Sequence, residues 1–241
     1  MATTDAPQPE ATAQPESAAS ASSVRPLTVG ILGAGRVGTA VGRQAVRAGH
    51  TVKIATGRPA EDIKLLTEVI VPGAEAVNKE DLQGADLIIT AVPLHKYRSI
   101  DTSVLQGHIV VDTMNYWAPV DGLMEEFEGD RSTSEVIAEF FGDVKLVKTL
   151  NHIGYGDLEV DSHPPGDPNR RALAVASDHD DAKALVMQFI DSLGYDPVDA
   201  GPLSAGRAFE NGTEIFNGRH TAEQMRQLLQ EHPVKETASS R

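Results

Sequence analysis

The stretch LTVGILGAGRVGTAVGRQAVRAGHTVKIATGR, residues 27–58, decides the fold of this chain. Its apolar run over 27–34 predicts a strand that ends in a glycine turn. The apolar residues over 36–50 recur at helical spacing, and a second β-rich run follows at 52–56. The stretch therefore predicts a strand, a turn, a helix and a second strand in succession.

The remainder of the chain continues this alternation of short apolar runs and helical patterns. Further strands are expected over 75–79, 85–93, 108–115, 144–151 and 172–177. The runs at 85–93 and 108–115 are apolar on both faces, as buried parallel strands are. The alternation predicts an α/β fold, a Rossmann-type doubly wound parallel sheet with a small C-terminal α/β extension.

Two later helices carry recognisable end signals, and a third is expected from its apolar spacing. Ser132 and Glu135 have the spacing of a capping box ahead of an apolar run. A second helix is expected from about 180 to 193, with Gly194 at the position of a left-handed cap residue. The segment 221–230 predicts a short amphipathic helix.

The glycine turn matches the GxGxxG pattern. It consists of Gly33, Ala34, Gly35, Arg36, Val37 and Gly38. Gly33 permits the tight turn, Gly35 lets the main chain approach a pyrophosphate, and Gly38 lets the helix pack closely on the sheet. Because the motif follows a strand and opens a helix, it predicts a dinucleotide site with the phosphates at the helix N-terminus. The alternative is a strand–turn–helix unit that binds nothing.

The end of the second strand indicates which dinucleotide is bound. Sites that prefer NAD usually carry an acidic residue there, whereas this chain has Thr56, Gly57 and Arg58. A hydroxyl, a main-chain amide and a guanidinium suit the 2′-phosphate of NADP, and Arg36 is a candidate second cation. The alternative is that Arg58 is a solvated loop residue and that cofactor specificity is mixed.

Two later strand ends carry further candidates for the cofactor site. Ala91, Val92, Pro93 and Leu94 follow the strand at 85–93, where the nicotinamide half would pass along the sheet edge. Asn115 ends the strand at 108–115. It is expected either to orient a carboxamide or ribose, or to turn the chain.

Composition argues against several classes of protein. The 21 basic and 35 acidic residues give a formal net charge of −14, which disfavours nucleic-acid binding. The absence of cysteine excludes disulfides and thiolate chemistry, and the eight histidines lack metal-ligand spacing, so no metal is expected. No apolar run approaches the roughly 20 residues of a membrane span. The first residues lack a basic start and an apolar core, so we do not expect them to be a secretory signal. We expect a cytoplasmic protein with no membrane partner.

Beyond these motifs, an ordered set of segments between about 28 and 216 resembles a known family. They are GAGRVG, ATGR, TAVP, DRSTSEVIAEF followed by VKLVKTLNHIG, and DPVDAGPLSAGRAFE at 196–210. Together they resemble the NADP-dependent oxidoreductases of coenzyme F420, an 8-hydroxy-5-deazaflavin. The chain is also similar to the nucleotide-binding domain of the STEAP metalloreductases.

The resemblance implies direct hydride transfer between NADPH and a deazaflavin ring. Carried over by position, Asn151, Ile153 and Gly154 would line the ring site, and Pro202, Leu203 and Arg207 would bind the substrate. Characterised members have a histidine where this chain has Asn151, with His152 displaced by one position. A flavin, a quinone or a small carbonyl compound is therefore an alternative acceptor. A non-catalytic NADP-binding sensor is a further alternative.

These features divide the chain into four expected regions. They are a disordered tail at 1–25, an NADP-binding Rossmann domain at 26–150, a smaller region at 151–232 that completes the acceptor site, and a tail at 233–241. The expected partner is a small-molecule redox acceptor. The apolar C-terminal stretch is a candidate homodimer contact.

Overall fold

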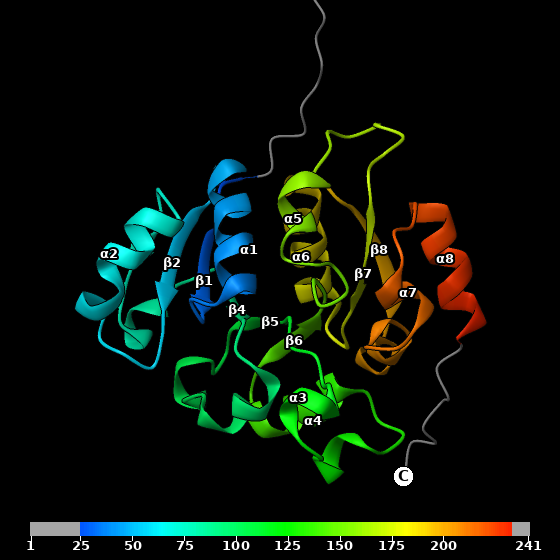
Figure 1. Ribbon diagram of the computed structural model, residues 1–241, viewed down its shortest axis with the longest axis horizontal. Helices are drawn as coiled ribbons and strands as arrows, with labels where there is room; N and C mark the ends of the chain where they lie inside the picture. The colour runs from blue at the N-terminus through cyan, green and yellow to red at the C-terminus, as the bar shows by residue number, and fades with distance from the viewer. Residues whose placement is uncertain (1–24, 233–241) are drawn as a thin grey trace, which may run out of the picture.

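A single sheet of eight strands organises the computed structural model, which describes residues 25–232. The strand order is β3-β2-β1-β4-β5-β6-β7-β8 (Figure 1). The strands are β1 Thr28–Leu32, β2 Thr51–Ala55, β3 Glu75–Ala76, β4 Leu87–Thr90, β5 Ile109–Asp112, β6 Lys145–Lys148, β7 Ala172–Ala176 and β8 Asp196–Gly201. The two predicted tails lie outside the described residues, apart from Arg25.

Helices cover both faces of this sheet. They are α1 Arg36–Arg47, α2 Ala60–Ile70, α3 Ala118–Asp121, α4 Thr133–Phe141, α5 Asp157–Val160, α6 Asp180–Ser192, α7 Glu214–Asn217 and α8 Ala222–Glu231. Side chains alternate between the two faces along each strand. On β4, Leu87 and Ile89 pack in the core with α1, α5 and α6, whereas Ile88 packs in the core with α4. The doubly wound α/β arrangement predicted from the sequence is therefore confirmed.

The sheet is not wholly parallel, which corrects one expectation. β6 and β7 pair antiparallel, with Lys148 opposite Ala176, while the other neighbouring strands run parallel. A parallel pair needs a crossover, usually a helix that spans the sheet. The connection from β6 to β7 contains only the four-residue α5, which packs beside α1. The chain therefore returns to the sheet in the opposite direction.

The last two strands extend the same sheet beyond the expected boundary at 150. β7, β8 and α8 enclose an additional apolar cluster that includes Ala174, Val198 and Met225. β8 was not expected from the sequence, because Pro197 and Gly201 make its segment a poor strand former. It lies at the edge of the sheet, where proline is tolerated. The division into two regions stays a prediction.

The structure confirms the two helix ends that were predicted from capping residues. Ser132 Oγ accepts a hydrogen bond from the Glu135 amide at 3.2 Å, and Glu135 Oε2 accepts one from the Ser132 amide at 2.7 Å. Gly194 has φ of 95°, the left-handed conformation expected after α6. The capping box and the glycine cap are both confirmed.

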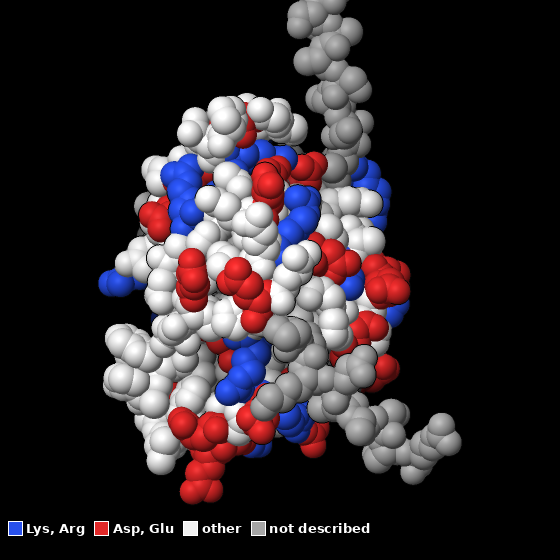
Figure 2. All heavy atoms as spheres, turned by 90° about the vertical axis from the view of Figure 1, so that its right-hand side faces the viewer, with Lys and Arg blue, Asp and Glu red and all other residues white. Residues whose placement is uncertain are grey.

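Charged side chains are distributed over the surface without segregation by sign on the face that carries α7 and α8. Figure 2 shows acidic and basic groups interspersed there. No helix within residues 25–232 is both long enough and apolar enough to cross a bilayer.

A fully buried ion pair joins the ends of β5 and β6. Lys148 Nζ lies 3.2 Å from Asp112 Oδ2, and both side chains are 0% exposed. Asp112 also accepts hydrogen bonds from Ser134 Oγ at 2.7 Å and from the Met114 amide at 2.9 Å. Lys148 Nζ donates to the Met114 carbonyl. Each buried charge thus has several partners, as burial in an apolar interior requires.

We expect Lys148→Met to lower the free energy of unfolding by about 3–5 kcal/mol, because it leaves the Asp112 carboxylate buried without its counter-charge. Urea denaturation measures this loss. The double variant Asp112→Asn/Lys148→Met removes both charges and should recover part of it. A Lys148→Met protein as stable as the wild type would show that the pair does not hold the strand ends together.

Candidate functional site

Two glycines of the GxGxxG turn are required by the packing of the protein itself. Gly33 has φ of 121°, and a Cβ there would lie 2.4 Å from the Ala91 carbonyl oxygen. A Cβ on Gly38 would lie 2.0 Å from the Gly33 carbonyl oxygen. These approaches bring the start of α1 against the ends of β1 and β4, as predicted for the tight turn and the close helix.

Gly35 differs from these two glycines. Its φ of −81° and ψ of −173° suit any residue, and a Cβ there would meet no atom of the described residues within 4 Å. Gly35 is the residue before the first turn of α1, and its position carries no side-chain cap. The open space therefore lies at the amide end of α1, where backbone N–H groups attract an anion. This geometry fits a pyrophosphate.

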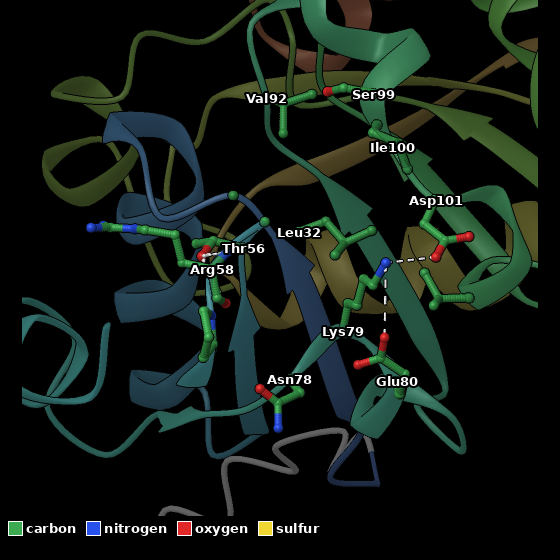
Figure 3. A pocket seen from close by; sticks show the side chains of 14 residues that line it. Leu32, Thr56, Arg58, Asn78, Lys79, Glu80, Val92, Ser99, Ile100 and Asp101 are labelled. Carbon is green, nitrogen blue, oxygen red and sulfur yellow. Dashed lines mark hydrogen bonds and ion pairs between the residues drawn. The ribbon is translucent and has the colours of Figure 1, made fainter. Parts of the chain in front are cut away.

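A cavity of about 490 Å³ opens beside the glycine turn (Figure 3). Five of the predicted cofactor residues line it, namely Gly33, Thr56, Gly57, Arg58 and Val92. The apolar part of its lining comes from Leu32, Pro59, Val92, Ile100 and Val104. A cleft that combines apolar walls with polar groups suits an adenosine moiety.

Two cations line this cavity, and only one is held by an acidic side chain. Lys79 Nζ lies 2.6 Å from Asp101 Oδ2 and 3.8 Å from Glu80 Oε1 (Figure 3). The hydrogen bonds from Lys79 and Ser103 lower the pKa of Asp101 to about 2. The guanidinium of Arg58 makes no hydrogen bond or ion pair with any residue from 25 to 232.

The main chain at Arg58 is ordered by its neighbour. The Arg58 amide donates to Thr56 Oγ1 at 3.1 Å, which closes a tight turn at the end of β2. Gly57 lies between them, and a Cβ there would meet no described atom within 4 Å. The turn thus presents a hydroxyl, an exposed backbone and an uncommitted guanidinium at one rim of the cavity, a donor set that suits a phosphate.

Sequence reasoning missed the opposite wall of the cavity. Asn78, Lys79 and Glu80 come after β3, and Ser99, Ile100 and Asp101 lie at the end of the 3-10 helix Leu94–Ser99. The first group had a local signal, because Asn78 and Asp81 have the spacing of a capping box that begins a helical turn. The pairing of β3 with β2 then brings this turn to the cavity. We find no local signal for the second group, because its position depends on how the chain returns after β4.

Arg36 does not join Arg58 at the cavity, contrary to expectation. Its Nη1 donates to Tyr155 Oη at 3.1 Å, and its guanidinium carbon lies 5.4 Å from the centre of the Tyr155 ring. Gln44, on α1, donates to the Leu158 carbonyl at 2.5 Å. The segment after β6 is therefore bound along α1, and it brings Tyr155 to the glycine turn.

Asn115 and Asn151 form a reciprocal pair where β5 and β6 have ended. Asn115 Nδ2 donates to the Asn151 carbonyl at 2.7 Å, and Asn151 Nδ2 donates to Asn115 Oδ1 at 3.0 Å. Asn151 Nδ2 also donates to the Phe209 carbonyl at 2.8 Å. Both amide hydrogens of Asn151 are thus used within the protein, whereas half-buried Asn115 retains a spare donor and acceptor.

His152 is turned away from the sheet edge and into the interior. It is 2% exposed, and burial lowers its pKa to about 3, with smaller contributions from Arg171 and Lys148. Residues 151–152 form a turn rather than a strand, and Leu150 before them has φ of 62°. A displacement by one residue along a strand would turn the side chain to the other face. Although residues 151–152 are not a strand, the His152 side chain does point away from the edge.

The other predicted residues fall into exposed and buried groups. Ile153, Leu94 and Leu203 are buried in the core, so only their main chains remain available to a ligand. Exposed Arg207 donates to the carbonyls of Gly129 and Arg131. Gly154, Pro202, Gly35 and Pro93 are exposed, and Ala34, Val37 and Ala91 are half-buried. The proposed contacts of these residues stay predictions.

The comparisons with known proteins agree with this geometry. Residues 28–116 match the family described as coenzyme F420-dependent NADP oxidoreductases. A hypothetical protein of Sinorhizobium meliloti is 30% identical, with a TM-score of 0.70 over 80% of this chain and 95% of that chain. An Arthrobacter protein proposed to be an F420-dependent NADP reductase has 24% identity and a TM-score of 0.63, covering 75% and 87% of the two chains.

Mouse and human metalloreductase STEAP2 are 27% and 26% identical over 190 residues. That region is 78% of this chain and 36% of each STEAP2 chain, so this chain spans about a third of the length of these relatives.

The doubly wound sheet, the glycine turn and the cavity at the end of β2 define a dinucleotide-binding protein of the NADP-dependent oxidoreductase class. Within that class, the chain belongs to the family of coenzyme F420-dependent NADP oxidoreductases.

Two neighbouring glycines give a matched test of the phosphate site. Gly35→Ala should leave the unfolding free energy unchanged but weaken NADPH binding by about 1–3 kcal/mol, the usual range for a methyl group forced into a filled site. Gly38→Ala should instead lower stability, because its Cβ meets the Gly33 carbonyl. Isothermal titration and urea denaturation separate the two effects. Unchanged NADPH affinity in folded Gly35→Ala protein would place the pyrophosphate elsewhere.

Proposed function

We propose that the chain binds NADPH and transfers its hydride to coenzyme F420 by direct ring-to-ring contact. The observation that carries the proposal is the rim at Thr56–Arg58. Where an NAD site has an acidic residue, this rim has a hydroxyl and a guanidinium with no ion-pair partner among residues 25–232. Membership of the F420-dependent family supports the deazaflavin as acceptor.

In this proposal the dinucleotide lies across the carboxyl ends of the parallel strands. The adenosine occupies the cavity, and its 2′-phosphate meets Arg58 and Thr56. The pyrophosphate passes over Gly35 at the amide end of α1, where no side chain intervenes. The nicotinamide continues past the end of β4 toward Asn115, beyond β5.

The protein's contribution to such a reaction is positioning. Hydride transfer between two rings requires a short distance, alignment and exclusion of water, rather than an acid or a base. Asp112 and Glu210 are the carboxylates considered nearest the candidate site, and both have structural partners instead of a free acid–base role. Asp112 pairs with Lys148, and Glu210 accepts hydrogen bonds from the amide and hydroxyl of Thr133.

A second candidate function keeps the NADPH site and changes the acceptor to a flavin, a quinone or a small carbonyl compound. Asn151 favours this candidate, because its amide hydrogens are both used inside the protein and it replaces a histidine of the deazaflavin enzymes. The similarity to STEAP2 supports a change of acceptor, since those relatives are named metalloreductases rather than F420 reductases. An NADP-binding sensor without turnover is the remaining alternative.

The acceptor is identified by following NADPH oxidation at the nicotinamide absorbance with coenzyme F420, FMN, FAD, a quinone and a small aldehyde offered separately. Turnover with coenzyme F420 alone is the expected result. Turnover with another acceptor but not with coenzyme F420 would establish the second candidate. NADPH binding without oxidation by any of them would favour the sensor.

Arg58→Ala should weaken NADPH binding by about 1–3 kcal/mol, because a charge-assisted contact with the 2′-phosphate is lost. NADH lacks that phosphate, so its affinity should change little. Arg47→Ala is a suitable control, since Arg47 lies in the last turn of α1 and does not line the cavity. Titration of all three proteins with both cofactors measures the effect. Equal losses for NADPH and NADH in Arg58→Ala would refute this assignment of the 2′-phosphate site.

A further inference from the structure

A chain of hydrogen bonds runs from the interior of the sheet to the edge where the nicotinamide is proposed to lie. It begins at the β7 amide of Ala174, passes through His152 and Asn151, and ends at Asn115. The protonation state of His152 determines which atom donates and which accepts at each of the following hydrogen bonds.

The tautomer of His152 follows from its partner on β7. The Ala174 amide donates to Nε2 at 3.0 Å, so Nε2 is the acceptor of the ring and the proton is on Nδ1. Nδ1 lies 3.2 Å from Asn151 Oδ1 and donates to it. Deep burial keeps the imidazole neutral, since it disfavours the imidazolium.

The donor at Nδ1 determines which way the Asn151 amide faces. With Oδ1 toward His152, Nδ2 faces the Asn115 Oδ1 and the Phe209 carbonyl. A flipped amide would place its oxygen against two acceptors and its NH₂ against the Nδ1–H donor. Such a flip would leave the His152 Nδ1–H, the Phe209 carbonyl and Asn115 Oδ1 without their partners. The neutral histidine therefore excludes the flipped orientation.

The two hydrogen bonds with Asn151 fix the orientation of the Asn115 side chain. Its Oδ1 accepts from Asn151 Nδ2, and its Nδ2 donates to the Asn151 carbonyl. One N–H and one oxygen lone pair remain uncommitted on this half-buried side chain. That donor–acceptor pair is complementary to a carboxamide, which offers one C=O and one NH₂.

We propose that His152 is a positioning residue that, through Asn151, holds Asn115 in the orientation that recognises the nicotinamide carboxamide. The inference rests on the proposed NADPH site. It is supported by the main chain at Leu150, which has φ of 62° beside Asn151. Leu150 is the one non-glycine residue with positive φ between residues 25 and 232, and such strain concentrates at functional sites.

Two substitutions of His152 separate positioning from simple structural support. His152→Asn retains a donor at the place of Nδ1 but loses the acceptor for Ala174. His152→Gln retains an acceptor at the place of Nε2 but loses the donor to Asn151. Each variant removes one buried hydrogen bond, so a purely structural role predicts equal effects for both.

The readout is the ratio of the dissociation constants of 3-acetylpyridine adenine dinucleotide phosphate and NADP⁺. The analogue carries an acetyl group in place of the carboxamide. We expect His152→Gln to lower this ratio by about 3–10-fold, the effect of one misplaced hydrogen bond, and His152→Asn to retain the wild-type ratio. Equal ratios in the two variants would overturn the proposal.

Asn115→Ala provides a test that does not depend on altering the interior. It should lose the preference for NADP⁺ over the analogue while His152 remains intact. Full retention of the preference in Asn115→Ala would overturn the proposal even if both His152 variants failed to fold. Failure of wild-type protein to bind NADP⁺ at all would instead refute the proposed function on which the inference rests.

Discussion

The buried ion pair of Lys148 and Asp112 is the constraint on which the functional edge of this protein depends. The two residues face each other in the register of β5 and β6, and neither can lose its partner without leaving a charge in an apolar interior. Asn115 and Asn151 each follow three residues later, and they hydrogen-bond to one another. The ion pair thus aligns two strand ends, and the asparagines continue that alignment to the sheet edge.

The glycines of the turn are explained by two different physical causes. Gly33 and Gly38 are demanded by the protein's own backbone, which approaches within 2.4 and 2.0 Å of where their Cβ atoms would lie. Gly35 has an ordinary conformation and open space in front of it. Folding does not require a glycine at this position, and the open space agrees with the proposed path of the pyrophosphate. This contrast makes the turn a binding element as well as a tight connection.

The proposed cofactor and acceptor ends of the site differ in whether side chains are available to contact a ligand. At the cofactor end, Lys79 is ion-paired with Asp101, whereas Arg58 has no acidic partner in the described part of the chain and can supply a counter-charge to a phosphate. At the acceptor end, Asn151, Ile153 and Leu203 are engaged or buried within the protein. We therefore propose that shape and main-chain groups around Asn115, rather than these side chains, recognise the acceptor.

The sequence by itself determined the elements whose causes are local. Apolar spacing predicted β1, α1, β2 and the buried strands, the Ser132 and Glu135 pair predicted the start of α4, and the residues after β2 predicted the rim of the cavity. Only the tertiary structure decided the antiparallel return of β7, the pairing of Arg36 with Tyr155, and the hydrogen-bond chain through His152. Periodicity and capping act within a few residues. Those three features depend on segments brought together from distant positions in the chain, which no local pattern encodes.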